Sequence, residues 1–488
     1  MVAFSQLEGA EGFDVSPYIA QSLERSCIEN FDSNTDYFAG LSDVGGQNSD
    51  FAITYHKSYK IVTARDPFLA DSKYLLVQCG APVPSAQEHG ITGEFQTIEI
   101  PPVSYGVQSH TALSFFHNLG ALDGFKFNPT AFDIPSCVNG KLLEGSGFCD
   151  ATCIQNTWAS MDECAVDILF DDGYSQVSPI AGKATVRVSE FNSKTVSDQF
   201  EWITYVSAFL NREAIAQDTI AAFNNRFSCL KSGVNAGGAN FLFITFFSTT
   251  DKKFYLGSCD NYYCDYVTQL GGNTLEVRDG FSSLSAQEIA DGLQSQGKAV
   301  DHIIVHWYAE RSEGFITGPD FGPDKTLTEL IQLIEGNAAQ SGTPLSVYDL
   351  GDYNSWFYFQ KAAPELYLHD LIKITDNGKA QAGMDFFFLD QYYPTNLNAA
   401  QTASTDLFGD TCSCPSHVLE NAVTGSCADA TLNSGFHAKK NTYNSESACN
   451  PSFGNYAAMC ESAAHSISVN VVTWMNALVM LLAAVFAM

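Results

Sequence analysis

The chain has 488 residues, of which 24 are Lys or Arg and 55 are Asp or Glu, so its formal net charge is −31. That length predicts two or three domains and is ample for a large core, while the excess negative charge repels a phosphate backbone and argues against nucleic acid as a partner. The same charge modestly favours a neutral or cationic ligand over a strongly anionic one.

The N-terminal part predicts an extension followed by short strands. Residues 1–48 carry little periodic pattern, and we expect them to wrap the first lobe. Apolar runs separated by Gly, Pro and polar clusters then follow, as is usual for strands. These runs are Phe51–Ile53, Tyr59–Val62 and Tyr74–Val77.

Between Ala184 and Ser232 the pattern changes to a strand, a turn and two amphipathic helices. Apolar residues recur every three to four positions, along one face of each helix. They are Phe200, Ile203, Val206 and Leu210, then Ile220, Phe223, Phe227 and Leu230. Asn211 tolerates a left-handed backbone, so it can end the first helix while Arg212 and Glu213 begin the second. The stretch predicts a connector between two lobes, with two ordinary core helices as the alternative.

Strands and helices alternate again beyond the connector. Phe241–Phe247 is a continuous apolar run, typical of one strand covered on both faces. A helix is expected over Tyr262–Leu270, and the capping-box spacing of Ser285 and Glu288 starts another. His302–Trp307 and Leu345–Tyr348 supply further strands. We therefore expect an α/β fold, with two α/β lobes joined by a long connecting helix and a ligand cleft between the lobes.

Several stretches, in this order, resemble the class III periplasmic binding proteins, the bacterial binding proteins for iron-siderophore complexes, haem and cobalamin. That family has a strand ending in Glu, an E-W-I helix, a break with [KR]-E and one long helix joining its lobes. The matching stretches are Val186–Glu190, Glu201–Ile203 and Phe209–Glu213. Thr111–Phe127 resembles the family's helix and short strand. Ala165–Gly173 resembles a later strand, with Val166 for the usual Pro, and Trp356–Ile374 the closing segment, with Glu365 for the usual Asp.

This resemblance implies a function in binding. The ligand it implies is an iron-siderophore complex captured for uptake, and the negative charge favours a ferric hydroxamate within that class; cobalamin or haem in the same cleft are the alternatives. No intrinsic cofactor is expected. Bacterial members dock to a permease through a surface Glu on each lobe, and Glu190 matches one such position. The transporter or endocytic partner stays open.

A search for catalytic motifs also favours binding. The chain has no H-E-x-x-H, G-x-S-x-G, P-loop or G-x-G-x-x-G pattern. His302 and His306 lie on an apparent strand, which favours satisfied sheet histidines over zinc ligands. Asp171-Asp172-Gly173 follows a strand, where a turn is favoured over a cation site. We infer that the protein is not an enzyme, with a hydrolase lacking a recognised motif as a remote alternative.

Loops that follow strand ends are where α/β folds place their ligands. Aromatic faces pack against large planar or chelated ligands, and Arg contacts carboxylate or chelate oxygens. The candidate ligand-binding residues are Arg65, Tyr105 and Asp172 in the first lobe, and Trp307, Tyr308, Tyr353 and Trp356 in the second. Core packing of each aromatic and a surface salt bridge for Arg65 are the alternatives. A structural or adhesive surface protein that has lost its pocket is the alternative from another class.

The 14 cysteines indicate an oxidising compartment. Their even number and irregular spacing favour disulfides over zinc, because no paired C-x2-C units occur. Cys149 and Cys153 as metal ligands are the alternative, and the pairing stays open. Gln401–Glu461 is rich in Ser, Thr, Ala, Asn and Cys and has few large apolar residues, so we expect the segment 377–461 to form a disulfide-stapled stalk or cap.

The last residues, Val471–Met488, form an apolar run with no basic flank after it. Small residues beginning at Ser462 and a polar spacer precede the run, the arrangement of a glycolipid (GPI) anchor signal, which implies a eukaryotic cell surface or endomembrane lumen. A retained membrane helix is the alternative. Met1–Gly12 lacks the features of an export signal, so we expect a truncated or misassigned start.

These patterns together give the expected domain organisation. It comprises an N-terminal extension (1–48), an N-terminal α/β lobe (49–194), a helical connector (195–232), a C-terminal α/β lobe (233–376), a Cys-rich stalk or cap (377–461) and an anchor signal or membrane tail (462–488).

Overall fold

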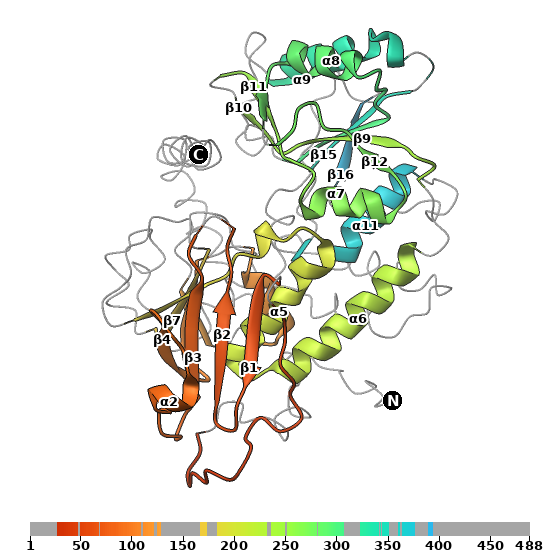
Figure 1. Ribbon diagram of the computed structural model, residues 1–488. Helices are drawn as coiled ribbons and strands as arrows, with labels where there is room; N and C mark the ends of the chain where they lie inside the picture. The colour runs from red at the N-terminus through yellow and green to blue at the C-terminus, as the bar shows by residue number, and fades with distance from the viewer. Residues whose placement is uncertain are drawn as a thin grey trace, which may run out of the picture.

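The structure is a computed structural model. It describes residues 27–46, 49–67, 69–108, 111–121, 124–127, 166–172, 183–231, 236–248, 251–280, 282–306, 323–340, 342, 344–350, 360–361, 364–375 and 389–393. We call the described residues up to 231 the N-terminal half and those from 236 the C-terminal half. Figure 1 shows the N-terminal sheets at one end of the molecule and the C-terminal sheets at the other, with α5 and α6 beside the N-terminal sheets and extending toward the C-terminal half.

The first sheet of the N-terminal half has the order β1-β2-β3-β4. Its strands are β1 (Phe51–Tyr55), β2 (Tyr59–Ala64), β3 (Ser72–Gln78) and β4 (Gln96–Ile100), with the short helix α2 (Ala86–His89) before β4. The first three strands are antiparallel and β4 is parallel to β3. The strands expected from the apolar runs are therefore present.

The second sheet has the order β6-β5-β7-β8, and all its neighbouring strands are parallel. Its strands are β5 (Tyr105–Val107), β6 (Phe125–Phe127), β7 (Ile168–Asp171) and β8 (Ala184–Arg187), and α3 (Leu113–Asn118) lies between β5 and β6 in the chain. Since the strands are parallel, their carboxyl ends lie along one edge of the sheet.

The two helices predicted between Ala184 and Ser232 are present as α5 (Val196–Leu210) and α6 (Glu213–Lys231). Thr195 caps α5 by accepting a hydrogen bond from the amide of Asp198. Asn211 ends the helix with φ at 54°, the left-handed conformation predicted for it. Every residue of α5 except Ser197, Asp198 and Glu201 is buried, so this helix lies inside the core.

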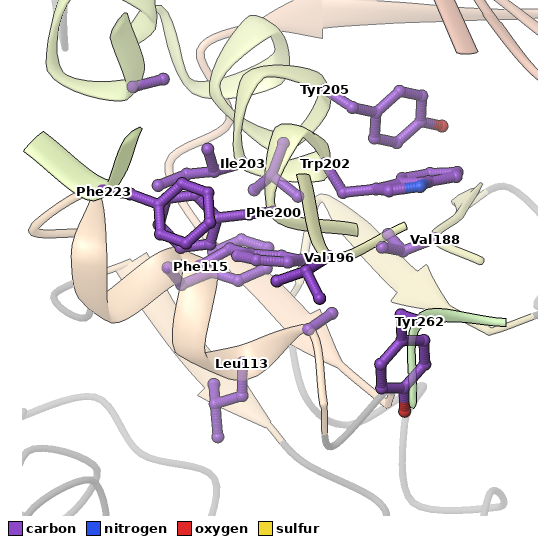
Figure 2. Close-up of a cluster of buried hydrophobic side chains, with 14 of the residues drawn as sticks. Leu113, Phe115, Val188, Val196, Phe200, Trp202, Ile203, Tyr205, Phe223 and Tyr262 are labelled. Atoms are coloured by element: carbon purple, nitrogen blue, oxygen red, sulfur yellow. The ribbon is translucent and has the colours of Figure 1, made fainter. Parts of the chain in front are cut away.

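Aromatic side chains fill the space around α5. Phe200 of α5 packs against Phe223 of α6 with ring centroids 4.5 Å apart, and Trp202 packs against Tyr205 at 4.9 Å. Figure 2 shows this cluster, in which side chains from α3, α5 and α6 gather with Tyr262 of the C-terminal half at the edge. Burial on this scale stabilises the connector by packing, because isolated helices of this length are marginal in water.

The larger sheet of the C-terminal half has the order β12-β9-β14-β15-β16. Its strands are β9 (Asn240–Ile244), β12 (Asn273–Thr274), β14 (His302–Val305), β15 (Ser346–Leu350) and β16 (Leu389–Tyr393). Only β16 is antiparallel to its neighbour. A smaller antiparallel sheet contains β10 (Phe246–Ser248), β11 (Lys253–Leu256) and β13 (Ser282–Leu284).

The helices of this half are α7 (Tyr262–Gln269), α8 (Ala286–Ser295), α9 (Pro323–Glu335) and α11 (Pro364–Thr375), with a 3-10 turn, η5, at Ala338–Gln340. The predicted capping box is present at the start of α8: Ser285 accepts from the amide of Glu288, and the Glu288 carboxylate accepts from the amide of Ser285. Sheets covered by helices confirm the expected α/β class.

One strand prediction was wrong. The run Phe241–Phe247 divides at Thr245 into β9 and β10, which belong to different sheets. The amide and the hydroxyl of Thr245 both donate to the carbonyl oxygen of Tyr255, at 2.9 and 2.8 Å, so the chain turns there from one sheet toward the other. The apolar run predicts that these residues are buried, but it does not indicate that the chain passes from one sheet to another.

The larger C-terminal sheet separates two apolar clusters. Residues on one face, among them Leu242, Ile303 and Val305, pack with α8 and α9. The opposite face contributes Phe241, Phe243 and Ile304 to a cluster that also contains α5, α6, α7, α11 and the core of the N-terminal half. The two halves therefore share one continuous apolar core.

Two disulfides join described residues. Cys27–Cys79 ties the segment before β1 to the end of β3, and Cys259–Cys264 closes a short loop at the start of α7. Ile28 also donates its amide to the carbonyl of Cys79 at 2.8 Å. Within the described residues no helix combines the length and apolarity needed to cross a bilayer. Ser462, the apolar tail and the segment 377–461, apart from β16, lie outside those residues.

Candidate functional site

Polar residues collect where the parallel strands of the N-terminal half end. Thr111 follows β5, Asp172 follows β7, and Glu190 follows β8 in the 3-10 turn η4 (Glu190–Asn192). Because these strands share one edge of their sheet, the three side chains are brought to the same end of that half. The loops that leave this edge, 109–110 and 173–182, lie outside the described residues.

Glu190 is the most enclosed of these groups, with an exposed fraction of 0%. Its Oε1 accepts a hydrogen bond from the Thr111 hydroxyl. Its Oε2 has no hydrogen-bond partner within the described part of the chain. One carboxylate oxygen is thus left unsatisfied in the interior, which is costly for an ionised group.

The turn that carries Glu190 is held by side chains around it. Ser193 Oγ donates to Asp50 Oδ2 at 2.5 Å and accepts from Trp202 Nε1 at 3.2 Å. Asn192 Nδ2 donates to Asp66 Oδ2 at 3.3 Å. These contacts fix the position of the carboxylate, so its burial follows from the fold of the turn.

The C-terminal half contributes two further polar side chains, His306 and Lys361, near Glu190. His306 follows β14, and Lys361 lies between β15 and α11. Lys361 is 2% exposed; its Nζ donates to the Tyr262 hydroxyl at 3.0 Å and lies 4.1 Å from the centroid of the Tyr262 ring. His306 Nε2 hydrogen-bonds to Tyr367 OH at 3.0 Å, and its ring packs on Phe243.

Hydrogen bonds join the two halves beside these groups. The amide of Val196, at the start of α5, donates to Asp265 Oδ2 of α7 at 3.0 Å. Gln360 Nε2 donates to Gln199 Oε1 at 3.2 Å and to Tyr266 OH at 3.0 Å. An exposed ion pair between Lys194 and Asp260 lies at the rim. We call this contact region between the halves the junction.

Burial and mutual electrostatics shift the ionisable groups of the junction. Burial raises the pKa of Glu190 to about 7, against the opposing effects of Lys361 and the Thr111 hydrogen bond. Burial lowers the pKa of Lys361 to about 7, and the negative charge of Glu190 opposes that shift. Burial and then Lys361 lower the pKa of His306 to about 3, so this imidazole is neutral at physiological pH.

The structure places the first-lobe candidates apart from one another. Arg65 Nη1 donates to the carbonyl of Ser49 at 2.6 Å, next to the first sheet. Tyr105 is 3% exposed and packs against Phe116 and Phe170, so its ring faces the core, as the core-packing alternative expects. Asp172 is half-buried and close enough to Glu190 to raise the pKa of that carboxyl. Of the three, Asp172 alone lies at the junction.

The second-lobe candidates lie outside the described residues. These are Trp307, Tyr308, Tyr353 and Trp356; the alternative metal ligands of the first lobe, Cys149 and Cys153, also lie outside the described residues. Trp307 and Tyr308 directly follow the described residue His306, and Tyr353 and Trp356 fall in the gap between the described residues Leu350 and Gln360. These four residues stay predictions for the ligand-binding loops.

Glu190 requires a correction. The resemblance gave it a surface position for docking to a partner, but its carboxylate is enclosed between the two halves and cannot reach a partner in this state. The reason is tertiary: the fold buries Glu190 and places Lys361 and Tyr262, both distant in sequence, close enough to interact with its carboxyl electrostatically. A partner-docking role for Glu190 would need the junction to open.

Sequence reasoning missed Lys361, Tyr262 and Thr111. One signal was present: Lys361 is the only charged residue between Asp352 and Glu365, within a strongly aromatic stretch. A lone lysine in such a context indicates either a snorkelling side chain or a buried, partnered one. In the part of the chain that the structure describes, no group of three or more His, Cys, Asp or Glu side chains is arranged to hold a metal ion.

Comparisons with known proteins concern the fold. No family model and no curated protein matches the chain. Among solved structures, a periplasmic binding protein from Veillonella parvula matches with 10% identity and a TM-score of 0.44, over 64% of this chain and 97% of its own. A possible iron-binding, periplasmic solute-binding protein from Staphylococcus epidermidis matches with 13% identity and a TM-score of 0.41, over 56% of this chain and 98% of its own.

A periplasmic haem-binding protein from Pseudomonas aeruginosa matches with 12% identity and a TM-score of 0.39, over 59% of this chain and 98% of its own. At such identities the similarity describes the fold alone. These three solved structures are described as periplasmic or solute-binding proteins.

Proposed function

We propose that the protein is a cell-surface binding protein that captures a small-molecule metal chelate between its two halves for uptake. The observation that carries this proposal is the convergence of strand ends at the junction. Thr111, Asp172 and Glu190 follow parallel strands of one half, and His306 follows a parallel strand of the other. Ligands of open α/β folds bind outside the carboxyl ends of such strands.

The loops that continue from these strand ends carry the predicted ligand contacts. Trp307 and Tyr308 directly follow His306, and Tyr353 and Trp356 precede Gln360 and Lys361 in the sequence. Rigid strand ends position such loops, and large aromatic faces suit a planar or chelated ligand. The junction is therefore the described part of the proposed site, and these four aromatic residues are its predicted ligand contacts.

An iron-siderophore complex is the ligand class that we favour, with a ferric hydroxamate preferred. The net charge of −31 disfavours a strongly anionic ferric catecholate. Cobalamin and haem are the alternative chelates. The cysteine content and the tail with its candidate anchor residue Ser462 support export to a eukaryotic surface, where the uptake partner is an unknown transporter or endocytic receptor.

A structural or adhesive role is the second candidate, and one observation favours it. The described floor of the junction is filled by buried side chains, among them Tyr262, Tyr266 and Tyr367. A site closed in this way binds nothing unless the loops above it form the pocket or the halves move apart. The two candidates therefore differ in whether any chelate binds.

Ligand titration of the full chain, produced in an oxidising secretory host, distinguishes them. Ferric hydroxamate, ferric catecholate, haem and cobalamin are each titrated against intrinsic tryptophan fluorescence and by calorimetry. Saturable binding of one chelate at submicromolar concentration, weakened at least about tenfold in Trp356→Ala or Tyr308→Ala, is the expected result. Trp158→Phe, which changes a tryptophan that is not among the candidate ligand-binding residues, is the matched control and should leave affinity unchanged. Folded protein that responds to none of the four would remove the binding proposal and favour the structural one.

A further inference from the structure

The two charged side chains at the junction are arranged differently from an ordinary buried salt bridge. Glu190 and Lys361, which we call the junction pair, come from different halves and are both enclosed. Lys361 donates its hydrogen bond to Tyr262, and Oε1 of Glu190 accepts from Thr111. Oε2 of Glu190 has no hydrogen-bond partner within the described residues. The pair therefore bears the cost of leaving water without the full gain of contact.

A second buried pair in the same molecule provides the comparison. Lys60 of β2 and Glu213 of α6, the reference pair, are in direct contact, with Nζ and Oε1 2.5 Å apart. Lys60 Nζ also donates to the carbonyl of Ala208 and to Asn211 Oδ1, each at 2.7 Å, and lies over the ring of Phe38. The reference pair is thus satisfied in geometry and hydrogen bonding, and both members belong to the N-terminal half.

We propose that the junction pair is an electrostatic release device, which makes separation of the two halves at the junction easier than the surrounding apolar contacts alone would allow. Opening the junction returns both side chains to water and so recovers the hydration that closure removes. The apolar core shared through α5, α6, α7 and α11 opposes this separation. The halves are therefore held together by packing and loosened by charge.

The pKa values agree with this reading. With both near 7, the closed junction favours a protonated Glu190 below neutral pH and a deprotonated Lys361 above it. Asp172 faces the pair from the end of β7, His306 from the end of β14, and Tyr262 and Tyr263 from α7. A single uncompensated charge consequently remains at either pH extreme: the ammonium in acid and the carboxylate in alkali.

Substitution of Glu190 and substitution of Lys361 should therefore tighten the junction at different pH values. Glu190→Gln removes the buried carboxylate charge, so it should close the junction more tightly at pH 9 and have little effect at pH 5, where Glu190 is already neutral. Lys361→Met removes the buried ammonium, so it should tighten the junction at pH 5 and have little effect at pH 9. Both effects are expected of the protein without ligand, so they do not depend on which ligand the protein binds.

Hydrogen exchange of the full chain measures the opening. The amide of Val196 donates across the junction to Asp265, so peptides covering residues 190–200 report its separation directly. Comparing variant with wild type at one pH cancels the intrinsic exchange rate. We expect exchange to slow by at least about tenfold, the equivalent of one pKa unit, for Glu190→Gln at pH 9 and for Lys361→Met at pH 5.

The reference pair supplies the control. Lys60→Met combined with Glu213→Gln removes a buried ion pair of the same chemistry away from the junction. In this double variant the exchange of residues 190–200 should not slow relative to wild type at either pH 5 or pH 9. If both junction variants instead speed exchange at both pH values, the pair is a stabilising bridge and the proposal is wrong. If Lys361→Met folds poorly, Glu190→Gln alone tests the proposal, because glutamine has nearly the same shape as glutamate. The slowing of exchange in Glu190→Gln must then be larger at pH 9 than at pH 5.

Discussion

Lys60 and Glu213 are 153 residues apart in sequence and form a buried ion pair between β2 and the start of α6. Burial lowers the pKa of Lys60, and the carboxylate of Glu213 opposes that shift. Removing one member leaves the other charged and buried without a partner, which generally costs about 3–5 kcal/mol. We therefore expect Lys60→Met to lower the free energy of unfolding by about that amount in denaturant titrations.

The matched comparison for this loss is the exposed pair of Lys194 and Asp260, whose side chains are 66% and 65% exposed. Solvent screens such pairs, so Lys194→Met should change the free energy of unfolding by about 0–1 kcal/mol. In the double variant Lys60→Met, Glu213→Gln most of the loss should be recovered. A cost for Lys60→Met no greater than that for Lys194→Met would contradict the structural account of the buried pair.

Asn211 combines a left-handed backbone with two side-chain hydrogen bonds, one from Lys60 and one to Gln78 at 2.7 Å. Asn211→Ala and Asn211→Gly remove the same hydrogen bonds, but only glycine adopts φ near 54° without strain. We expect both variants to be destabilised, with the alanine variant less stable than the glycine variant by about 1 kcal/mol. Equal stability in thermal or urea unfolding would show that the backbone conformation at this position carries no cost.

The capping box of α8 should contribute measurably to stability. Ser285→Ala leaves the amide of Glu288 without its cap, which typically costs about 1 kcal/mol. Ser285→Thr keeps the hydroxyl and should retain most of that stability, so it serves as the control. A Ser285→Ala protein with an unchanged urea midpoint would show that another group satisfies the helix terminus.

His306 should make the protein sensitive to acid. Its pKa is about 3 when folded, against 6.5 for an unperturbed imidazole, so the unfolded chain binds one more proton between these values. Stability is therefore full above about pH 6.5 and falls as the pH drops toward 3, by about 1.4 kcal/mol per pH unit at most. His306→Gln should lose that slope relative to wild type in unfolding curves collected from pH 7 to pH 4.

The control for that prediction is His302, whose burial lowers its pKa to about 4. His302→Gln should remove a slope of the same sign, ending nearer pH 4. If the wild type and His306→Gln differed by a constant amount at every pH, the imidazole would be protonated equally in the folded and unfolded chains, and the buried neutral state would be wrong.

Local signals in the sequence predicted local structure well. The helix end at Asn211 and the helix start at Ser285 were predicted correctly, because a helix terminus depends on residues within a few positions of each other. The run Phe241–Phe247 was assigned to one strand since apolarity reports burial and not which sheet receives each residue. The alternation in β2 placed Lys60 on the same buried face as Val62 and Ala64, a signal that could have identified it as an interior charge.

The candidate site depended on contacts that no local pattern contains. Tyr105 is an aromatic residue in a short strand, and only the tertiary fold shows that its ring packs on Phe116 and Phe170. The family resemblance gave Glu190 a surface position, whereas the fold buries it and brings Lys361, 171 positions further along the chain, close enough to act on its pKa. Long-range pairing of this kind arises when two halves meet, so it becomes visible only with the fold.

The disulfide between Cys27 and Cys79 makes a covalent ring of the first three strands. The ring includes β1, β2, the whole of β3 and the exposed turn around Asp32 to Asp36. A protease that cuts once between Ile28 and Gln78 leaves the two pieces attached to each other under oxidising conditions. Such a nick would keep the strand edges paired and the sheet in place, and the fragments would separate on a denaturing gel only after reduction.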